Sequence, residues 1–400
     1  MAVLCVLCVL CGDKKLQSPP KKRKALNKKS IIIIGGGISG LGVGLAAARS
    51  GQRPVILEAR EIASATSDNT LRIIHGGFRY LQKFDLPRVF RSLGDQTSVA
   101  TDYFQYVKPL ACLMPLTRFG LKSRITVSVA AILYGAAMRT ARSKLNPPRV
   151  LNSKELLAEL SPALSDYAPN GALCWHDLVM TDPQGLAKCA ATEITAKGGE
   201  IRESTMVTRI ERCSDGFVVT TSTGESLLAE RVVNTLGPWL SSVEIPESLR
   251  GTRPDWCIGF NVTINRLIDP TYAAATQSDD GRLFFAVPRG EFTTIGTWYY
   301  PCSSPHLDSP QKPQVMESEI QRFINSWNRS WPSQRIVMAD IRAIDSGILP
   351  MRRDSPSGPI LYGAEIIHRS SDRCYIEVLS TKYTSFRSVG LRVLGSLRNI

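Results

Sequence analysis

Three glycines and one glutamate near the start of the chain have the types and spacing that a nucleotide-binding turn requires. Gly35 permits a tight turn after a strand, and Gly37 removes the Cβ that would keep a diphosphate from the backbone. Gly40 lets the following helix lie close to the strand, so that its N-terminal N–H groups face phosphate charge. Glu58 follows 23 residues after Gly35, where a carboxylate accepts from both ribose hydroxyls. An acid here favours FAD or NAD over NADP.

A strand, a helix and a second strand must hold these residues, and the sequence supplies them in order. Ile31–Ile34 is a run of four β-branched residues, which is typical of a buried parallel strand. Leu41–Ser50 is rich in small residues and predicts the helix, which Gly51 ends. Pro54–Leu57 predicts the second strand, with Glu58 at its tip. This order predicts a Rossmann-like α/β domain.

A second segment distinguishes FAD from NAD. Residues 63–82 are rich in small and hydroxyl side chains and turn through Gly76 and Gly77. Such a loop offers many hydrogen-bond donors in little volume, which suits a chain beside a diphosphate and an isoalloxazine ring. His75 either contacts the flavin or holds the turn through a backbone hydrogen bond. An NAD-dependent dehydrogenase would leave this segment and residues 375–387 without a role, so the sequence favours FAD.

Further strands follow in the middle of the chain. Residues 201–212 and 216–222 alternate in polarity around the turn at 214–216, which predicts a hairpin. Val232–Asn234 predicts another short buried strand, which Gly237 and the proline after it stop.

Residues 63–82 and 375–387 resemble the corresponding segments of FAD-dependent glycerol-3-phosphate dehydrogenases, within the wider D-amino-acid oxidase-like flavoenzyme family. The similarity continues through roughly residues 30–390. Further matching segments are VKPLACLMP at 107–115, GALCWHDLVMTD at 171–182, RVVNTLGPW at 231–239 and GRLFFAVPRGEFTTIGT at 281–297.

The resemblance implies an α/β fold in which a Rossmann-like FAD-binding domain with a parallel sheet carries a discontinuous substrate domain on a mostly antiparallel sheet. The expected division is a basic disordered tail at 1–29, FAD-binding parts at 30–105, 183–255 and 345–400, and substrate-domain parts at 106–182 and 256–344. A last helix from about Tyr383 would direct its N-terminal N–H groups at the flavin and stabilise negative charge on the reduced ring.

The implied reaction is oxidation of a small hydroxylated molecule by hydride transfer to flavin N5, with a quinone or oxygen as electron acceptor. The residues expected to contact FAD are Gly35, Gly37, Ile38, Ser39, Gly40, Glu58, Ala59, Ser67, Thr70, His75, Gly76, Gly77, Val207, Gly237 and Lys382.

The family's substrate positions are only partly kept. Arg79, Tyr80, Lys382 and Arg387 match cations and a tyrosine of the glycerol-3-phosphate enzymes and are expected to form an anion pocket.

Two positions depart from the family pattern. Asn261 stands where the family has a histidine, and Leu349 stands where it has a substrate-binding arginine. Asparagine cannot act as a base at neutral pH. Two alternatives therefore remain open: oxidation of an amino acid or 2-hydroxy acid, and a flavin-binding protein that has lost its substrate specificity.

Charge and cysteine content indicate which other kinds of partner, metal site or membrane attachment the chain is expected to have. The chain of 400 residues has a net charge of +14, but residues 13–29 carry eight cations against one acid, so the remainder is only moderately basic and predicts no nucleic-acid partner. Seven of the ten cysteines are scattered after the tail and lack metal-site spacing, so we expect reduced thiols and no metal. The other three, Cys5, Cys8 and Cys11, belong either to an unstructured extension or to a segment that holds a metal or carries acyl chains. The apolar run Met1–Leu10 is too short to cross a membrane. We expect a cytoplasmic protein, with peripheral contact of the basic tail with anionic lipid as an alternative; the oligomeric state stays open.

Overall fold

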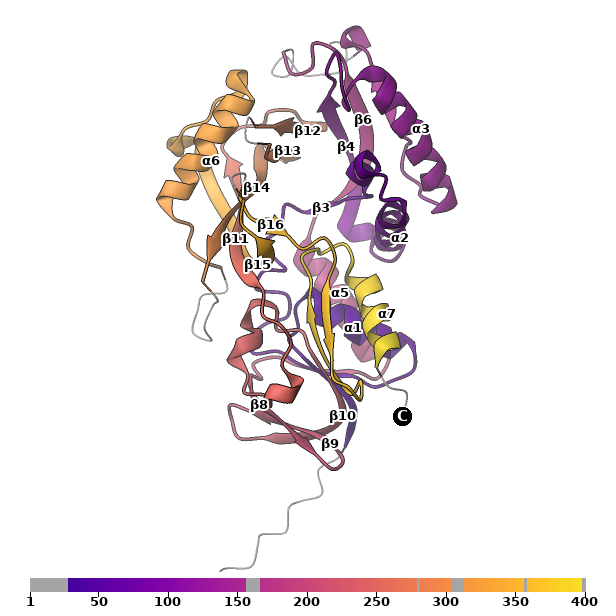
Figure 1. The fold of residues 1–400 in the computed structure, drawn as a ribbon, viewed down its shortest axis with the longest axis vertical. Helices are drawn as coiled ribbons and strands as arrows, with labels where there is room; N and C mark the ends of the chain where they lie inside the picture. The colour runs from indigo at the N-terminus through magenta and orange to yellow at the C-terminus, as the bar shows by residue number, and fades with distance from the viewer. Residues whose placement is uncertain (1–27, 156–165, 279–280, 304–311, 356–357, 398–400) are drawn as a thin grey trace, which may run out of the picture.

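The computed structural model describes residues 28–155, 166–278, 281–303, 312–355 and 358–397. The predicted tail, with its apolar run and three cysteines, therefore lies outside the described residues except at its last two positions. Two sheets dominate the molecule, one above the other in the view of Figure 1. The six described helices are α1 (Ile38–Arg49), α2 (Leu86–Asp102), α3 (Arg124–Thr140), α5 (Pro183–Ala196), α6 (Glu317–Ser330) and α7 (Phe386–Ser396).

The first sheet is the predicted parallel sheet. Its central order is β17-β18-β10-β1-β2-β7, in which β18, β10, β1, β2 and β7 run parallel and β17 pairs antiparallel with β18. The β8–β9 hairpin extends from β10. Its strands are β1 (Lys29–Ile34), β2 (Val55–Leu57), β7 (Glu200–Arg202), β8 (Val207–Cys213), β9 (Gly216–Thr221), β10 (Ser226–Asn234), β17 (Ile366–Arg369) and β18 (Tyr375–Leu379).

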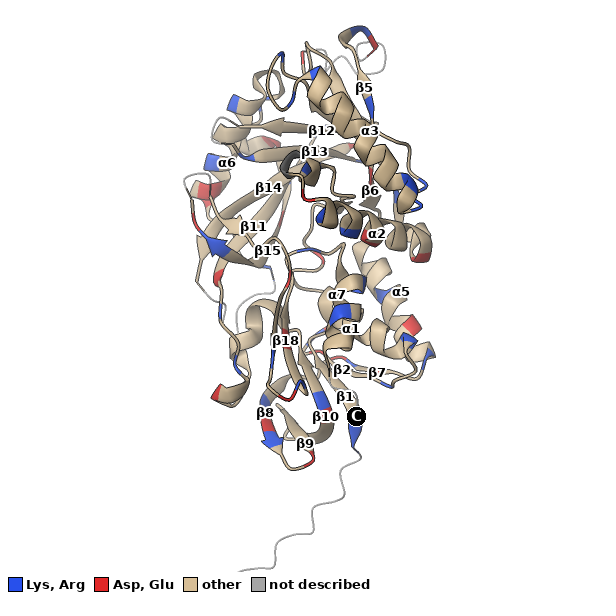
Figure 2. Ribbon diagram, turned by 45° about the vertical axis from the view of Figure 1, so that its right-hand side comes forward, with Lys and Arg blue, Asp and Glu red and all other residues tan. Residues whose placement is uncertain are grey.

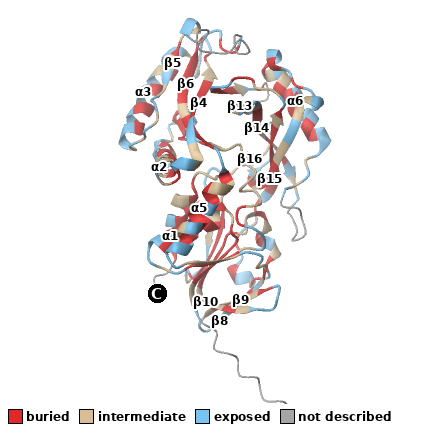
Figure 3. Ribbon diagram, turned by 180° about the vertical axis from the view of Figure 1, so that it is seen from behind, coloured by how far each residue is buried: buried red, intermediate tan, exposed pale blue. Residues whose placement is uncertain are grey.

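The isoleucines of β1 are buried on both faces of this sheet, as a parallel strand requires. Ile31 and Ile33 pack in the cluster that includes α1, α5 and α7. Ile32 and Ile34 pack on the other side with the β8–β9 hairpin. Figure 3 shows this buried interior between the helices and the strands.

Helices α1 and α7 approach closely because two glycines face each other. A Cβ at Gly42 would overlap the carbonyl oxygen of Phe386, and one at Gly390 would overlap that of Gly42. This contact fixes the C-terminal helix beside the first helix of the nucleotide-binding unit.

The second sheet is mostly antiparallel, with order β16-β15-β11-β14-β13-β12-β4-β6-β3 and β5 paired to β6. Its one parallel pair among the described strands is β4 with β12. Helix α6 covers β11–β14, while α2 and α3 pack on β4 and β6. The strands are β3 (Ile73–Ile74), β4 (Val107–Pro115), β5 (Arg149–Leu151), β6 (Ala172–Met180), β11 (Asp255–Ile264), β12 (Tyr272–Gln277), β13 (Leu283–Arg289), β14 (Phe292–Cys302), β15 (Ile341–Arg353) and β16 (Ile360–Leu361).

The predicted fold class, a parallel Rossmann-like sheet with a mostly antiparallel second sheet, is confirmed. The six-part division of the chain stays a prediction. The structure places β3 in the antiparallel sheet, although it falls within the predicted part at 30–105. It also places β16 and the end of β15 there, although they fall within the part at 345–400.

Two predicted elements differ in detail. The single strand expected at 201–212 is two strands, β7 and β8, because residues 203–206 leave the parallel sheet and Ser204 adopts a φ of 52°. The last helix begins at Phe386 rather than near Tyr383, so the residues before it form a turn.

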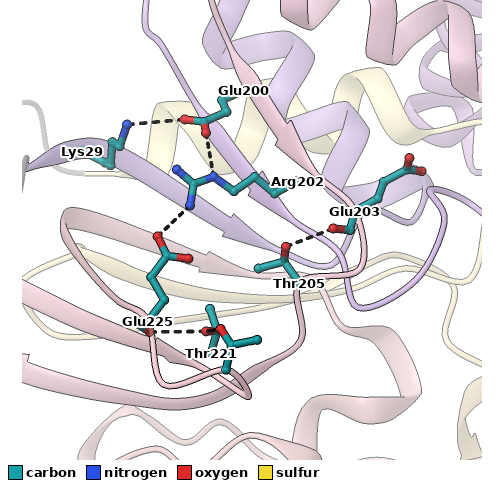
Figure 4. Close-up of polar contacts among 8 residues, drawn as sticks. Lys29, Glu200, Arg202, Glu203, Thr205, Thr221 and Glu225 are labelled. Carbon is teal, nitrogen blue, oxygen red and sulfur yellow. Dashed lines mark hydrogen bonds and ion pairs between the residues drawn. The ribbon is translucent and has the colours of Figure 1, made fainter.

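An ion-pair network holds the crossing at 203–206 in place (Figure 4). Arg202 donates from Nε to Glu200 at 2.6 Å and from Nη1 to Glu225, in the turn between β9 and β10, at 3.0 Å. Lys29 Nζ lies 3.4 Å from the same Glu200 carboxylate. The network ties the edge strand β7 to the hairpin, and Thr205 between them bonds through its N–H to the carbonyl of Glu58.

Seven cysteines are free among the described residues, and no group of three or more metal-binding side chains forms there. None of the described helices combines the length and apolarity needed to span a bilayer.

Candidate flavin and substrate site

A cavity of about 490 Å³ lies between the two sheets. From the parallel sheet it is lined at the carboxyl ends of β1, β2 and β18, by Ile34, Leu57 and Leu379. Open α/β sheets place their ligands at these ends. From the antiparallel sheet it is lined by residues of β11, β14 and β15. Both halves of the molecule therefore form one site.

The glycine turn forms one end of the cavity. Gly35 has a φ of 98°, and its N–H donates to the carbonyl of Leu57 at 2.8 Å. A Cβ at Gly40 would overlap the carbonyl oxygen of Gly35, so this glycine is required for the close approach of α1 to β1. Gly37 is the N-cap residue of α1 and has no side chain to cap the helix. The helix N-terminus and the missing Cβ leave a cradle for an anion.

Glu58 stands beside this turn, as predicted. Its carboxylate accepts from the backbone N–H of Gly36 at 2.6 Å and from that of Arg60 at 3.0 Å. Burial raises the pKa of Glu58, although the hydrogen bonds from Gly36 and Arg60 oppose the change. A carboxylate has about four lone-pair sites, so the group can still accept from a sugar hydroxyl.

The segment after β2 folds back over the turn. Ser67 Oγ accepts from the N–H of Ile38, the first residue of α1, at 3.0 Å. Thr70 and His75 line the cavity. Gly76 and Gly77 do not line it: the N–H of Gly76 donates to Asp177 at 2.8 Å, and Gly77 has a φ of 91° at the start of the short helix η1 (Phe78–Lys83). These two glycines shape the turn that carries His75.

His75 is held by a side chain rather than by the backbone. Its Nδ1 lies 2.9 Å from Oδ2 of Asp177, on β6, which leaves Nε2 as the ring nitrogen available to the cavity. Asp177 is fully buried and also accepts from Gly76, Gln96 and Trp175. Burial opposes ionisation of Asp177, but these hydrogen bonds and His75 outweigh it and lower the pKa of Asp177. The arrangement is a histidine oriented by an ionised carboxylate.

A tyrosine surrounded by cations forms a second polar group. Lys382 Nζ donates to the hydroxyl of Tyr80 at 2.8 Å, and the guanidinium of Arg88 lies 4.0 Å from the centre of the Tyr80 ring. Burial opposes ionisation of this phenol, but Lys382, Arg79 and Arg88 outweigh it and lower the pKa of Tyr80. Lys382, Tyr80 and Arg88 all line the cavity, which gives it a positive wall.

The two positions that depart from the family pattern also line the cavity. Asn261, on β11, is buried and accepts from Thr297 Oγ1 at 2.8 Å. Leu349, on β15, lies against Gly259 and gives an apolar wall. The neighbouring Arg352 and Arg353 are exposed and do not line the cavity, so neither replaces the missing arginine.

Comparison with known proteins identifies the architecture. The family model of FAD-dependent oxidoreductases, DAO, matches residues 30–377. The chain belongs to this family. The predicted membership of the D-amino-acid oxidase-like flavoenzyme family is confirmed, and FAD is the cofactor on which this family depends.

Two similar family members are named after glycerophosphate or glycerol 3-phosphate. The chain is 28% identical to the alpha-glycerophosphate oxidase of Enterococcus casseliflavus over 80% of its own length and 54% of that protein. It is 25% identical to the aerobic glycerol-3-phosphate dehydrogenase of Escherichia coli over 93% and 74%. The chain thus spans about half to three quarters of these relatives.

Solved structures show the same fold. The glycerol-3-phosphate dehydrogenase of Bacillus halodurans complexed with FAD superposes with a TM-score of 0.66 at 20% identity, over 92% of this chain and 64% of that one. The L-alpha-glycerophosphate oxidase of Mycoplasma pneumoniae with FAD bound gives 0.68 at 15% identity, over 93% and 95%.

The residues on the cavity wall suit the family's cofactor. A helix N-terminus preceded by a glycine, and an acid at the end of the second strand, provide the chemistry that a diphosphate and a ribose need. The predicted flavin contacts that line the cavity are Gly35, Gly37, Ile38, Ser39, Glu58, Ala59, Ser67, Thr70, His75, Val207, Gly237 and Lys382. Gly40, Gly76 and Gly77 stand behind the wall.

Two predicted substrate residues are not brought to the cavity. Arg79 is exposed, with its guanidinium 5.7 Å from the centre of the Tyr80 ring. Arg387 forms an ion pair with Asp102 at 3.0 Å. Neither is among the lining residues, whereas Arg88 and Arg91 are. No motif in the sequence distinguishes Arg88 or Asp177 from the other charged residues.

Proposed function

We propose that this chain oxidises a small hydroxylated molecule that carries an anionic group, with glycerol 3-phosphate as the first substrate to test, and that bound FAD takes the hydride. The observation that carries the proposal is the pairing of two polar groups in one cavity: the oriented His75 and the cationic cluster of Tyr80, Lys382 and Arg88. The names of the similar family members support the same choice of substrate.

In this proposal each polar group has one task. His75 accepts the hydroxyl proton at Nε2 while Asp177 holds its Nδ1–H and stabilises the imidazolium that forms. Lys382 and Arg88 bind the anionic group of the substrate, and Tyr80 orients it. FAD, when bound, supplies the hydride acceptor for the C–H bond. Asn261 offers a hydrogen bond and no base.

Leu349 favours a second candidate. An apolar side chain where the family has an arginine removes one charge-assisted contact, about 1.5–3 kcal/mol of phosphate binding. A carboxylate needs fewer such contacts than a phosphate. A 2-hydroxy acid or an amino acid is therefore the alternative substrate class for the same site.

The test is anaerobic bleaching of the flavin absorbance. Bleaching by glycerol 3-phosphate supports the first substrate, bleaching by lactate or glycine supports the second class, and no bleaching by any of them refutes the proposed oxidation. Reoxidation by oxygen or by a quinone analogue then identifies the electron acceptor.

Variants assign the roles. His75→Asn should slow bleaching about 10²–10⁴-fold while FAD stays bound, because the proton acceptor is lost. Asp177→Asn should shift the pH dependence of bleaching, since the amide cannot stabilise an imidazolium. Lys382→Met should raise the substrate concentration that gives half-maximal bleaching. Lys188→Met, on the exposed side of α5, should leave that concentration unchanged. Equal rates for His75→Asn and the unaltered chain would remove His75 from the mechanism.

A further inference from the structure

The outer face of α3 and the loop before it carry large apolar side chains in water. Phe119 is 87% exposed and Leu121 70%, and on the helix Ile125 is 80% and Ile132 73% exposed. Val129 and Leu133 complete the set. Soluble proteins rarely expose a contiguous apolar surface of this kind unless something covers it.

These positions form one stripe. Residues 125, 129, 132 and 133 recur at helical spacing, while Val127, Ala131 and Tyr134 on the opposite side pack into the core with β4 and β6. Figure 1 and Figure 3 place α3 at the outer edge of the antiparallel half, away from the parallel sheet. The stripe therefore belongs to the outside of the molecule and is no part of its core.

The segment of chain that carries the stripe has charges of one sign. Residues 103–154 contain no Asp or Glu and nine cations. The cations are Lys108, Arg118, Lys122, Arg124, Arg139, Arg142, Lys144, Arg149 and Lys154. Figure 2 shows blue at the two ends of α3 and no red along the helix. Arg118, Lys122 and Arg124 alternate with the apolar residues of the loop and of the first turn of α3.

We propose that the apolar stripe of α3 and the loop at 117–122 dock on an anionic lipid surface. An apolar stripe flanked by cations is the pattern of a helix that lies in the bilayer interface, with its side chains among the acyl chains and its cations at the headgroups. A contact between two copies of this chain is disfavoured, because a two-fold interface here would bring the same cations together. This surface shares no residue with the basic tail or with the cavity described above.

The test is co-sedimentation of the full-length, FAD-loaded chain with vesicles of phosphatidylcholine, with and without phosphatidylglycerol. Binding is expected only with phosphatidylglycerol. It should fall as salt rises from about 0.1 to about 1 M, since the screening length shrinks from about 10 to about 3 Å. The double variant Ile125→Asp/Ile132→Asp should lower the partition coefficient of the protein onto the vesicles about tenfold or more.

The control keeps the tail and changes an exposed residue elsewhere. Val337, before β15, is also largely exposed, and Val337→Asp should bind vesicles like the unaltered chain. Flavin absorbance should be retained in both variants, because all three side chains lie outside the core. Unchanged binding by the α3 variant would overturn the proposal and assign membrane contact to another surface. Absent binding, together with a dimer in sedimentation velocity that Ile125→Asp/Ile132→Asp separates, would overturn it in favour of a second copy.

Discussion

A methyl group at position 37 should separate cofactor binding from folding. Gly37 has a φ of −66° and a ψ of 175°, a conformation that alanine adopts without strain. The one heavy atom within 4 Å of its added Cβ is Ser67 Oγ, at 3.4 Å. Since Gly37 lines the cavity, the methyl group of Gly37→Ala would stand in the space that the diphosphate needs.

The expected loss is at least one charge-assisted hydrogen bond between the turn and the cofactor. Such a bond contributes about 1.5–3 kcal/mol, so its loss should raise the dissociation constant for FAD about 10- to 150-fold. The free energy of unfolding of the flavin-free chain should stay within about 0.5 kcal/mol. Titration of the flavin-free protein with FAD, followed by flavin fluorescence, measures the first quantity, and urea unfolding measures the second.

Two other glycines serve as controls. Gly94, on α2, has open space around its Cβ, so Gly94→Ala should leave FAD binding unchanged and add about 0.5–1 kcal/mol of stability. Gly40→Ala should instead abolish folding, because the new methyl group overlaps the carbonyl of Gly35. An unchanged dissociation constant for FAD in Gly37→Ala would refute the assignment of the turn to the diphosphate.

Glu58→Gln keeps one acceptor oxygen of two, so it should weaken FAD binding roughly tenfold in the same titration, with the exposed Glu61→Gln as a control that changes nothing. Burial raises the pKa of Asp95 to about 6, so the folded chain binds more protons than the unfolded chain between about pH 4 and 6 and loses stability as the pH rises through this window. Asp95→Asn should therefore raise the free energy of unfolding by up to about 3 kcal/mol more at pH 8 than at pH 4, as measured by urea unfolding. An equal change in the free energy of unfolding at both pH values would contradict this. Arg253→Leu leaves the buried carboxylate of Glu377 without its two guanidinium contacts, at 2.6 and 3.0 Å, and should cost about 3 kcal/mol of unfolding free energy; a loss below about 1 kcal/mol would show that other donors suffice.

The flavin end of the site could be predicted because its parts are neighbours in the chain. Gly35, Gly37 and Glu58 belong to one strand-turn-helix-strand unit, in which each residue has a local steric or hydrogen-bonding reason. The hairpin at residues 201–222 was predicted less well, since the sequence shows alternation but not the change of sheet at 203–206.

The substrate end could not be predicted in the same way. The resemblance placed Tyr80 and Lys382 together, but it also placed Arg79 and Arg387 with them, and the structure leaves both arginines off the cavity wall. The direction in which a side chain leaves a short helix such as η1 depends on how that helix packs against distant elements. A sequence motif contains no information about this packing.

The sequence by itself therefore determined the nucleotide-binding unit and the cofactor class, because hydrophobic periodicity and glycine spacing act over a few residues. The second, antiparallel sheet was expected only from the resemblance to a known family. Only the tertiary structure decided how the polar groups combine. His75 meets Asp177 across 102 positions and Tyr80 meets Lys382 across 302, and both contacts depend on the packing of strands and helices that are distant in the chain. Hydrogen bonds act only at contact distance, so partners of this kind become known when the fold brings them together.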